Sequence, residues 1–257
     1  MKKNNRSNQI ISLLTITVIF ILWWTATNLH WTDERLIPTP QATWEGFLQI
    51  LIDYKGHSLL EHFTASMSRL FIAFFMAVVT AVPLGLLSGY SEKARAVMTP
   101  IIEFYRPLPP LAYYTLLVLA LGIGDESKIA LLYLACFAPI YIACMAGVLK
   151  VKEDFIRSAL TLGASRMQVF LRVIFPSCMA EIFTGIRTAI GVAYTTLVAA
   201  EMVAASSGIG WMVLDAKNWF RNDVIFVGII VMGVTGIFID CILRFLERKL
   251  VPWSGKV

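Results

Sequence analysis

The chain of 257 residues is poor in charge: Asp, Glu, Lys and Arg make up 15% of it, whereas about 25% is usual for a soluble domain. Hydrophobic residues account for 58% of the sequence, and the mean hydropathy is +0.71. This composition is not that of a soluble domain and indicates a membrane protein with several spans. We expect an all-α membrane fold in which residues 1–257 form a single transmembrane domain.

Residues that catalyse reactions or bind metals are also scarce. The three histidines, His30, His57 and His62, form no constellation with a serine, cysteine or carboxylate. The four cysteines include no CxxC pair, which favours small apolar packing residues over disulfides or metal ligands. P-loop, HExxH and EF-hand patterns are absent. The sequence therefore predicts no catalytic residue, no cofactor and no metal site in this chain.

Six apolar runs have, or approach, the length that a helix needs to cross a bilayer. We expect spans at about 10–29, 70–90, 108–124, 129–149, 182–205 and 224–246. The first run follows the cationic residues 1–6, as the apolar part of a signal peptide does, but it has about 20 residues and no small-residue cleavage site follows it. We expect it to be retained as the first helix.

The positions of Lys and Arg predict how the spans are oriented. With the N-terminus in the cytoplasm, 15 of these cations fall in inside segments and 6, including Arg69 and Lys128, fall in outside segments, while Arg187 lies within the fifth span. The net charge of +5 is thus a sign of topology rather than of a nucleic-acid surface. We expect a multi-pass chain with both termini in the cytoplasm.

The outer segment before the second span carries two helix-start signals. Thr39 followed by Pro40 is typical of an N-cap with proline at the first helical position. Ser58 and Glu61 have the spacing of a capping box, from which a helix is expected to continue through residues 59–89 into the second span.

The segment 91–107 is expected to be a cytoplasmic loop. Pro107, Pro109 and Pro110 predict a rigid and irregular entry into the third span. The spacing of Gly85–Gly89 is compatible with close helix packing, but short apolar helices show this pattern often, so no contact is predicted from it.

Ionisable residues inside the spans are candidates for a transport pathway. Glu201, near the outer end of the fifth span, either lines the pathway or a gate, or makes an interface hydrogen bond. Arg187 is expected to snorkel to the cytoplasmic face, and Asp240 and Arg244, four residues apart, to pair with each other. The remaining candidates for the pathway or a gate are Glu103, Arg106, Tyr113, Tyr114 and Tyr194.

The stretch 153–176 is the longest cation-bearing interruption between spans in the second half of the chain. Asp154 is a candidate cap for a first helix that stops at Gly163, and Ser165 for a second helix that ends before Pro176. Two capped helices outside the bilayer predict a docking surface for another protein.

This stretch resembles the EAA loop of the permeases of bacterial ABC importers. The family pattern is Glu-Ala-Ala, three residues, Gly, nine residues, an aliphatic residue, one further residue and Leu-Pro. Residues 157–159, Gly163, Val173 and 175–176 occupy these positions with the same spacing, although Arg-Ser replaces Glu-Ala at the start. The residues that this resemblance implies for coupling to an ATPase are Arg157, Ser158, Ala159, Gly163, Ala164, Ser165, Phe175 and Pro176.

The chain is similar to the taurine, sulfonate and nitrate subfamily from about residue 20 onward. The segments that carry the similarity are 100–112, 122–128, 197–201, 208–210 and the ending 250–255, the last of which is close to that of taurine permeases. One departure is Tyr113-Tyr114-Thr115, where relatives commonly have Trp, a variable residue and Pro.

The resemblance implies a type I importer permease of the bacterial inner membrane, with six spans and a two-helix coupling segment at 150–181. Two copies of the permease would form the pathway for taurine or a related sulfonate, with other alkanesulfonates and nitrate-like anions as alternatives. Two ATPase subunits holding ATP-Mg would bind the coupling segments, and a substrate-binding protein would dock outside. The permease itself would not be an enzyme.

Two other classes of protein compete with this interpretation. An ion-coupled carrier acting alone needs intramembrane acids near the midplane, and Glu201 lies too near one end of its span to fit well. A membrane-embedded enzyme needs a catalytic set, which the sequence lacks.

Overall fold

All regular secondary structure of the described residues, 5–33 and 36–253 of this computed structural model, is helical. The elements are α1 (Asn5–Asn28), α2 (Pro40–Ile52), α3 (Leu59–Tyr90), α4 (Glu92–Tyr105), α5 (Pro110–Leu121), α6 (Asp125–Leu149), α7 (Glu153–Thr161), α8 (Arg166–Val169), the π-helical turn η1 (Phe170–Ile174), α9 (Phe175–Ala204), α10 (Ile209–Asn218) and α11 (Asn222–Leu250). The prediction of an all-α fold is confirmed.

Within the described part of the chain, five helical runs are long and apolar enough to cross a membrane: 10–28 of α1, α3, α6, the continuous run 166–204, and α11. The predicted third span corresponds to α5, an apolar helix of only 12 residues. This is well short of the roughly 20 residues that cross a hydrocarbon core. The predicted spans are therefore present as five long helices and one short one.

The two helix starts predicted in the outer segment are confirmed. Thr39 caps α2 by accepting a hydrogen bond from the Ala42 amide at 3.1 Å, and Pro40 is the first helical residue. At the start of α3, the Ser58 amide donates to Glu61 at 2.8 Å and the Glu61 amide donates to the Ser58 hydroxyl at 3.3 Å. These reciprocal bonds start a helix of 32 residues that continues into the membrane span as expected.

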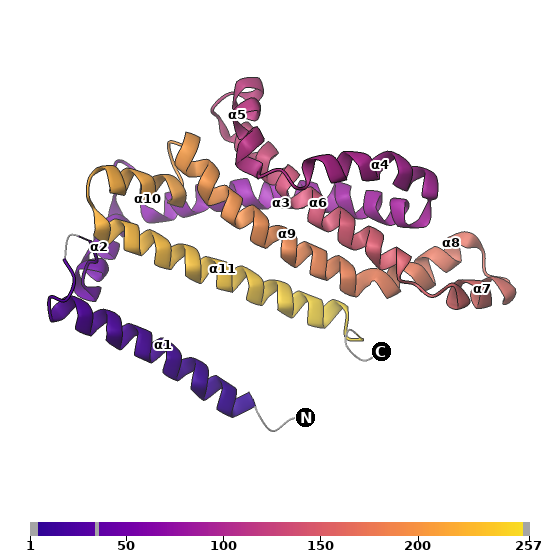
Figure 1. Ribbon diagram of the computed structural model, residues 1–257, viewed down its shortest axis with the longest axis horizontal. Helices are drawn as coiled ribbons and strands as arrows, with labels where there is room; N and C mark the ends of the chain where they lie inside the picture. Colours follow the sequence, from indigo (N-terminus) through magenta and orange to yellow (C-terminus); the bar gives the residue numbers. More distant parts are fainter. Residues whose placement is uncertain (1–4, 34–35, 254–257) are drawn as a thin grey trace. The chain divides into compact units, whose positions relative to one another are not determined.

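Contacts within the chain divide it into two compact units. The smaller unit contains the described residues up to His62 together with Met212–Met232, and the larger contains Phe63–Trp211 and the described residues from Gly233. In the larger unit α6 and α9 run side by side (Figure 1). Figure 1 also shows α7 and α8 as a short pair at one end of α9.

Small residues let the helices of the larger unit approach closely. A Cβ atom on Gly85 of α3 would lie 2.6 Å from the Tyr141 carbonyl oxygen of α6, and one on Gly89 would overlap Val148. Helices in lipid associate largely through such close van der Waals packing. Treating the Gly85–Gly89 spacing as a chance pattern was therefore wrong, since both glycines lie at the contact between α3 and α6.

In the smaller unit, polar side chains tie the segment after α2 to α10 and to the start of α11. Tyr54 donates its hydroxyl to Asp215 at 2.9 Å, and Lys55 pairs with the same carboxylate at 2.9 Å. Arg221 pairs with Asp223 at 2.7 Å. Burial and the hydrogen bond to Asp215 raise the pKa of Tyr54 above its ordinary value.

The segment 91–107, which was expected to be a cytoplasmic loop between two spans, is mostly the helix α4, and this helix was not predicted. Ser91 caps α4 by accepting a hydrogen bond from Ala94 at 3.4 Å, and Glu92 lies in the first turn, where a carboxylate favours the positive end of the helix dipole. Ser91 and Glu92 are local signals for the start of a helix, and they were missed because the segment is polar.

Arg187, which was expected to snorkel to the cytoplasmic face, has partners that were not predicted. Its guanidinium pairs with Asp240 at 3.2 Å and with Glu247 at 3.3 Å, both on α11. Asp240 pairs in addition with Arg244 at 2.6 Å, which confirms the pair predicted on the last helix. Arg187 thus links α9 to α11 in the larger unit.

Candidate functional site

The first helix of the coupling segment, α7, has nine residues and none of them is buried. It begins at Glu153, one residue before the expected cap, so Asp154 lies in the first turn and the prediction that it caps the helix was wrong. Lys152 occupies the cap position and its side chain makes no capping bond. Two carboxylates in the first turn stabilise the helix through its dipole instead.

Gly163 ends this helix, as predicted. Its φ of +86° is one that L-residues with a side chain rarely adopt. The Gly163 amide donates to the Leu160 carbonyl at 2.9 Å, and the Ala164 amide donates to the Ala159 carbonyl at 3.1 Å. These two bonds form a Schellman motif, so the turn between α7 and α8 is closed by backbone hydrogen bonds.

Ser165 caps the second helix, which is also confirmed. Its amide donates to Gln168 at 2.8 Å, and the Gln168 amide donates to the Ser165 hydroxyl at 3.3 Å, which is a complete capping box. After the four residues of α8, the helix widens into the π-helical turn η1.

The second helix does not end before Pro176, so that prediction was wrong. It continues through η1 into α9 as one helical run from Arg166 to Ala204. Proline lacks an amide hydrogen, and in a regular helix its ring clashes with the carbonyl four residues earlier. The π-helical turn that ends two residues before Pro176 changes this hydrogen-bond register, and such turns accommodate local interruptions within helices. The coupling segment is thus joined rigidly to the fifth span.

Side chains of α7 and its turn present a mixed surface of apolar and charged groups. Phe155 is 57% exposed and Leu162 is 88% exposed. Arg157 pairs with Glu153 at 2.6 Å, which places an acidic group beside the arginine that replaces the glutamate of the family pattern. Exposed apolar side chains on a short capped helix are typical of an interaction surface.

The structure places the predicted coupling residues in three consecutive positions. Residues 157–159 lie on α7, residues 163–165 form the turn and the following cap, and residues 175–176 start α9. Their role in coupling stays a prediction.

Near the opposite end of α9, Glu201 is buried and only 1% exposed. Its carboxylate accepts hydrogen bonds from the Ser66 hydroxyl at 2.8 Å, the Arg69 guanidinium at 2.8 Å and the Gly210 amide at 3.0 Å. We call Ser66, Arg69, Glu201 and their polar partners the buried ionic cluster. It joins α3, α9 and the start of α10.

Arg69 donates hydrogen bonds to several partners in this cluster. Besides Glu201, it bonds Asp125 at 2.8 Å and the Ser207 carbonyl at 2.8 Å. Lys128 lies three residues after Asp125 on α6 and donates to the carbonyl of Gly124 at 2.9 Å. These partners compensate the positive charges of two buried side chains.

Arg69 and Lys128, which were counted with the outer segments, are both buried within helices. Arg69 is 4% exposed and Lys128 is 2% exposed. The capping box at Ser58 indicated that Arg69 lies on a helix, because a helix that continues from Ser58 into the second span includes residue 69. Ser66 and Arg69, three residues apart, then fall on one helix face.

Gly208 is required for this arrangement. A Cβ atom there would overlap the carboxylate of Glu201, and the φ of Gly208 is +123°. The loop between α9 and α10 therefore depends on a residue without a side chain to approach the cluster. Of the two alternatives for Glu201, the position found is that of an interface hydrogen bond, and its part in a pathway stays a prediction.

The other predicted pathway residues are distributed over three helices. Glu103 and the neighbouring Arg106 are exposed at the end of α4. Tyr114 on α5 is 2% exposed and packs with Leu131 and Ala200, the residue before Glu201. Tyr113 and Tyr194 are half-buried on α5 and α9. The structure thus brings Tyr114, but not Glu103 or Arg106, into the surroundings of Glu201.

Among the described side chains, those of residues 10–33 and 36–253, no three His, Cys, Asp or Glu residues are grouped to hold a metal ion. The buried ionic cluster has cations and carboxylates that already bond to each other. Its chemistry is that of a structural junction between helices.

The long apolar helices, the capped helix pair beside one of them and the buried ionic cluster together define a membrane-embedded permease. Residues 81–252 match the family described as binding-protein-dependent transport system inner membrane component, and the chain belongs to this family. The predicted family is confirmed.

Relatives of known designation cover most of the chain. The taurine transport system permease protein TauC of Escherichia coli (strain K12) is 42% identical over 96% of this chain and 90% of the relative. A Bacillus subtilis (strain 168) protein, SsuC, named as a permease for aliphatic sulfonates, is 31% identical over 95% and 87%. The nitrate import permease protein NrtB of Leptolyngbya laminosa is 30% identical over 86% and 80%. The chain thus falls within the taurine, sulfonate and nitrate group of ABC permeases.

A solved chain of the MetNI methionine ABC transporter, in an inward-facing conformation, has a similar fold. The TM-score is 0.63 at 14% sequence identity, and the match covers 82% of this chain and 99% of the other. This similarity concerns the fold alone, and it is consistent with the type I importer fold that was predicted.

Proposed function

We propose that the chain is the permease subunit of an ATP-driven importer that takes up taurine or a related sulfonate. The observation that supports this most is the coupling segment, in which α7 buries no residue yet is held rigidly by a Schellman motif and a capping box. A partner that binds α7 can therefore transmit force to the membrane helices without bending a flexible loop.

The partner of α7 is a separate ATPase subunit, which holds ATP-Mg. Two copies of the permease form the pathway and two ATPase subunits bind them, while a substrate-binding protein docks on the outer side. Both termini lie in the cytoplasm, and the whole chain works as one permease domain. The permease itself catalyses no reaction, binds no cofactor and binds no nucleic acid.

Movement of the coupling segment reaches the buried ionic cluster through one continuous helix. The run that starts at Arg166 carries Glu201, which is about 52 Å further along at 1.5 Å per residue. Glu201 is bonded to Ser66 and Arg69 of α3. A displacement of the cytoplasmic end of this helix would therefore also move the point where α9 is bonded to α3. We place a gate at this junction, with Tyr114 beside it.

The remaining site residues have lesser roles in the proposal. Tyr113 and Tyr194 line the pathway together with Tyr114. Glu103 and Arg106 form its cytoplasmic mouth, where their exposed charges meet the solvent or the ATPase.

Reconstitution in liposomes tests the function. We expect no uptake and no ATP hydrolysis by the permease alone, and ATP-dependent taurine uptake when the ATPase subunit and the binding protein are added. Uphill uptake by the permease alone would contradict the proposal and favour an ion-coupled carrier.

The substrate is tested separately, because the external binding protein can select it. A screen of the cognate binding protein against taurine, other alkanesulfonates and nitrate is expected to give the tightest binding with taurine. Tightest binding of nitrate would retain the importer class and reject the proposed substrate.

A further inference from the structure

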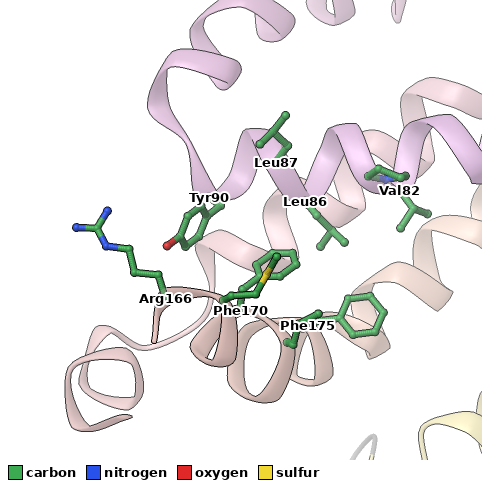
Figure 2. A pocket seen from close by; sticks show the side chains of 10 residues that line it. Val82, Leu86, Leu87, Tyr90, Arg166, Phe170 and Phe175 are labelled. Atoms are coloured by element: carbon green, nitrogen blue, oxygen red, sulfur yellow. The ribbon is translucent and has the colours of Figure 1, made fainter. Parts of the chain in front are cut away.

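An apolar pocket of about 780 Å³ opens between the end of α3 and the coupling segment, within the larger unit (Figure 2). Leu86, Leu87 and Tyr90 of α3 form one wall. Met167, Phe170 and Leu171 of α8 and η1 form the other. The volume is within the range of roughly 300–1,000 Å³ that is usual for ligand sites.

A contact between two aromatic rings sets the distance between the two walls, and the pocket is open to its surroundings. The rings of Tyr90 and Phe170 meet edge to face with centroids 5.9 Å apart, which fixes the spacing between α3 and η1. Leu86 is buried at the base, while Leu87 and Leu171 are each more than half exposed. Apolar side chains that line an open pocket are typical of a site that binds an apolar group.

A cation stands at the edge of this otherwise apolar pocket. Figure 2 shows the Arg166 side chain extending from the start of α8 on the side where the Tyr90 hydroxyl also points. Among the described residues, Arg166 has no ion-pair partner, in contrast to Arg157, which is paired with Glu153. An apolar pocket with an unpaired guanidinium at its edge is complementary to an anionic amphiphile.

We propose that this pocket binds one anionic phospholipid, with an acyl chain between α3 and η1 and its phosphate at Arg166. Basic pockets between membrane helices on the cytoplasmic side bind anionic headgroups in this way. The inference does not depend on which substrate is transported. Because one wall of the pocket belongs to the coupling segment, a bound lipid supports the position of α8 and η1 against α3.

Native mass spectrometry of the purified protein tests the proposal, with phosphatidylglycerol and phosphatidylcholine of identical acyl chains as probes. The wild type is expected to retain phosphatidylglycerol in preference to phosphatidylcholine. Arg166→Gln is expected to lower phosphatidylglycerol binding about five-fold, which corresponds to the ~1 kcal/mol contributed by one basic residue near anionic lipid. Arg172→Gln is the matched control, because Arg172 lies in the same segment but lines a different pocket.

A second variant tests the acyl-chain part of the site. Leu171→Trp adds volume at an exposed position of the wall and is expected to reduce the binding of both lipids. Equal binding of the two lipids by the wild type, or an unchanged preference in Arg166→Gln, would overturn the proposal. Cross-linking in membranes between two copies of the Leu87→Cys variant would also overturn the proposal, because a second copy would then cover the pocket. The control is the unsubstituted chain, in which Cys241 is the exposed cysteine and no such cross-link is expected.

Discussion

Glu201→Gln removes the negative charge of the buried ionic cluster while keeping the shape of the side chain. The carboxylate accepts bonds from the Ser66 hydroxyl, the Arg69 guanidinium and the Gly210 amide, all within 3.0 Å. A glutamine side chain has only one acceptor oxygen. Its NH2 group would face one of these donors and could not accept a hydrogen bond from it. Arg69, only 4% exposed, then keeps Asp125 as its carboxylate partner, and the Asp125 side chain is 55% exposed.

Breaking a buried ion pair by removing one partner typically costs about 3–5 kcal/mol of folding free energy. We expect the lower end of this range, about 3 kcal/mol, because Asp125 compensates part of the charge of Arg69. For a chain of this size, such a loss corresponds to a decrease in Tm of about 6–12 °C. Thermal unfolding of the detergent-purified protein, followed by tryptophan fluorescence, measures it.

Two further variants separate the ion pair from general damage. Asp125→Asn breaks the exposed pair of the same arginine and is expected to cost about 1 kcal/mol or less. Combining Arg69→Met with Glu201→Gln is expected to cost at least about 2 kcal/mol less than the sum of the single variants, because each single variant leaves the other partner unpaired. A change within about 0.5 kcal/mol for Glu201→Gln, or additive single effects, would refute the reasoning.

Three other substitutions test local features of the fold by the same unfolding measurement. Gly85→Ala is expected to cost about 1–3 kcal/mol, because the added methyl meets a backbone carbonyl, whereas Gly233→Ala has open space and is expected not to destabilise. Ser165→Ala removes the capping box and is expected to cost about 1 kcal/mol and to speed proteolysis of the coupling segment; an unchanged cleavage rate would contradict this. Tyr54→Phe loses the bond to Asp215 and is expected to cost about 1 kcal/mol. Since the folded pKa of Tyr54 is raised, this difference is expected to be full below the ordinary tyrosine pKa of about 10 and to shrink as the pH rises above it; a difference that grows with pH would be evidence against it.

Features set by neighbouring residues were predictable from the sequence. The caps at Thr39, Ser58 and Ser165 and the stop at Gly163 involve partners within five residues along the chain. The pair Asp240–Arg244 is local in the same sense. In the coupling segment, the stop at Gly163 and the cap at Ser165 were therefore predictable, whereas the predicted cap at Asp154 and the predicted helix end before Pro176 were wrong.

Features that depend on distant partners were not predictable in this way. Arg69 meets Glu201 more than a hundred positions later in the sequence, and Arg187 meets two acids of α11. Local spacing indicates neither set of partners, so these ion pairs were not predicted. The same reason explains why Gly85 gave no reliable signal, since its neighbour Tyr141 belongs to another helix.

The continuation through Pro176 was missed for a different reason. A proline is a local signal for a helix end, and the signal was applied correctly. The π-helical turn η1 before it changes the hydrogen-bond register, and no residue type in Phe170–Ile174 announces such a turn.

Co-purification of the ATPase subunit with the permease tests the central claim most directly. Gly163→Pro cannot adopt the positive φ of the turn between α7 and α8, while Gly122→Pro imposes the same conflict at the end of α5. Both glycines have open space around the Cβ position, so the two variants differ mainly in location. The wild type and Gly122→Pro are expected to retain the ATPase, and Gly163→Pro to insert into the membrane but lose it. Normal recovery of the ATPase with Gly163→Pro would contradict the assignment of α7 as the docking helix.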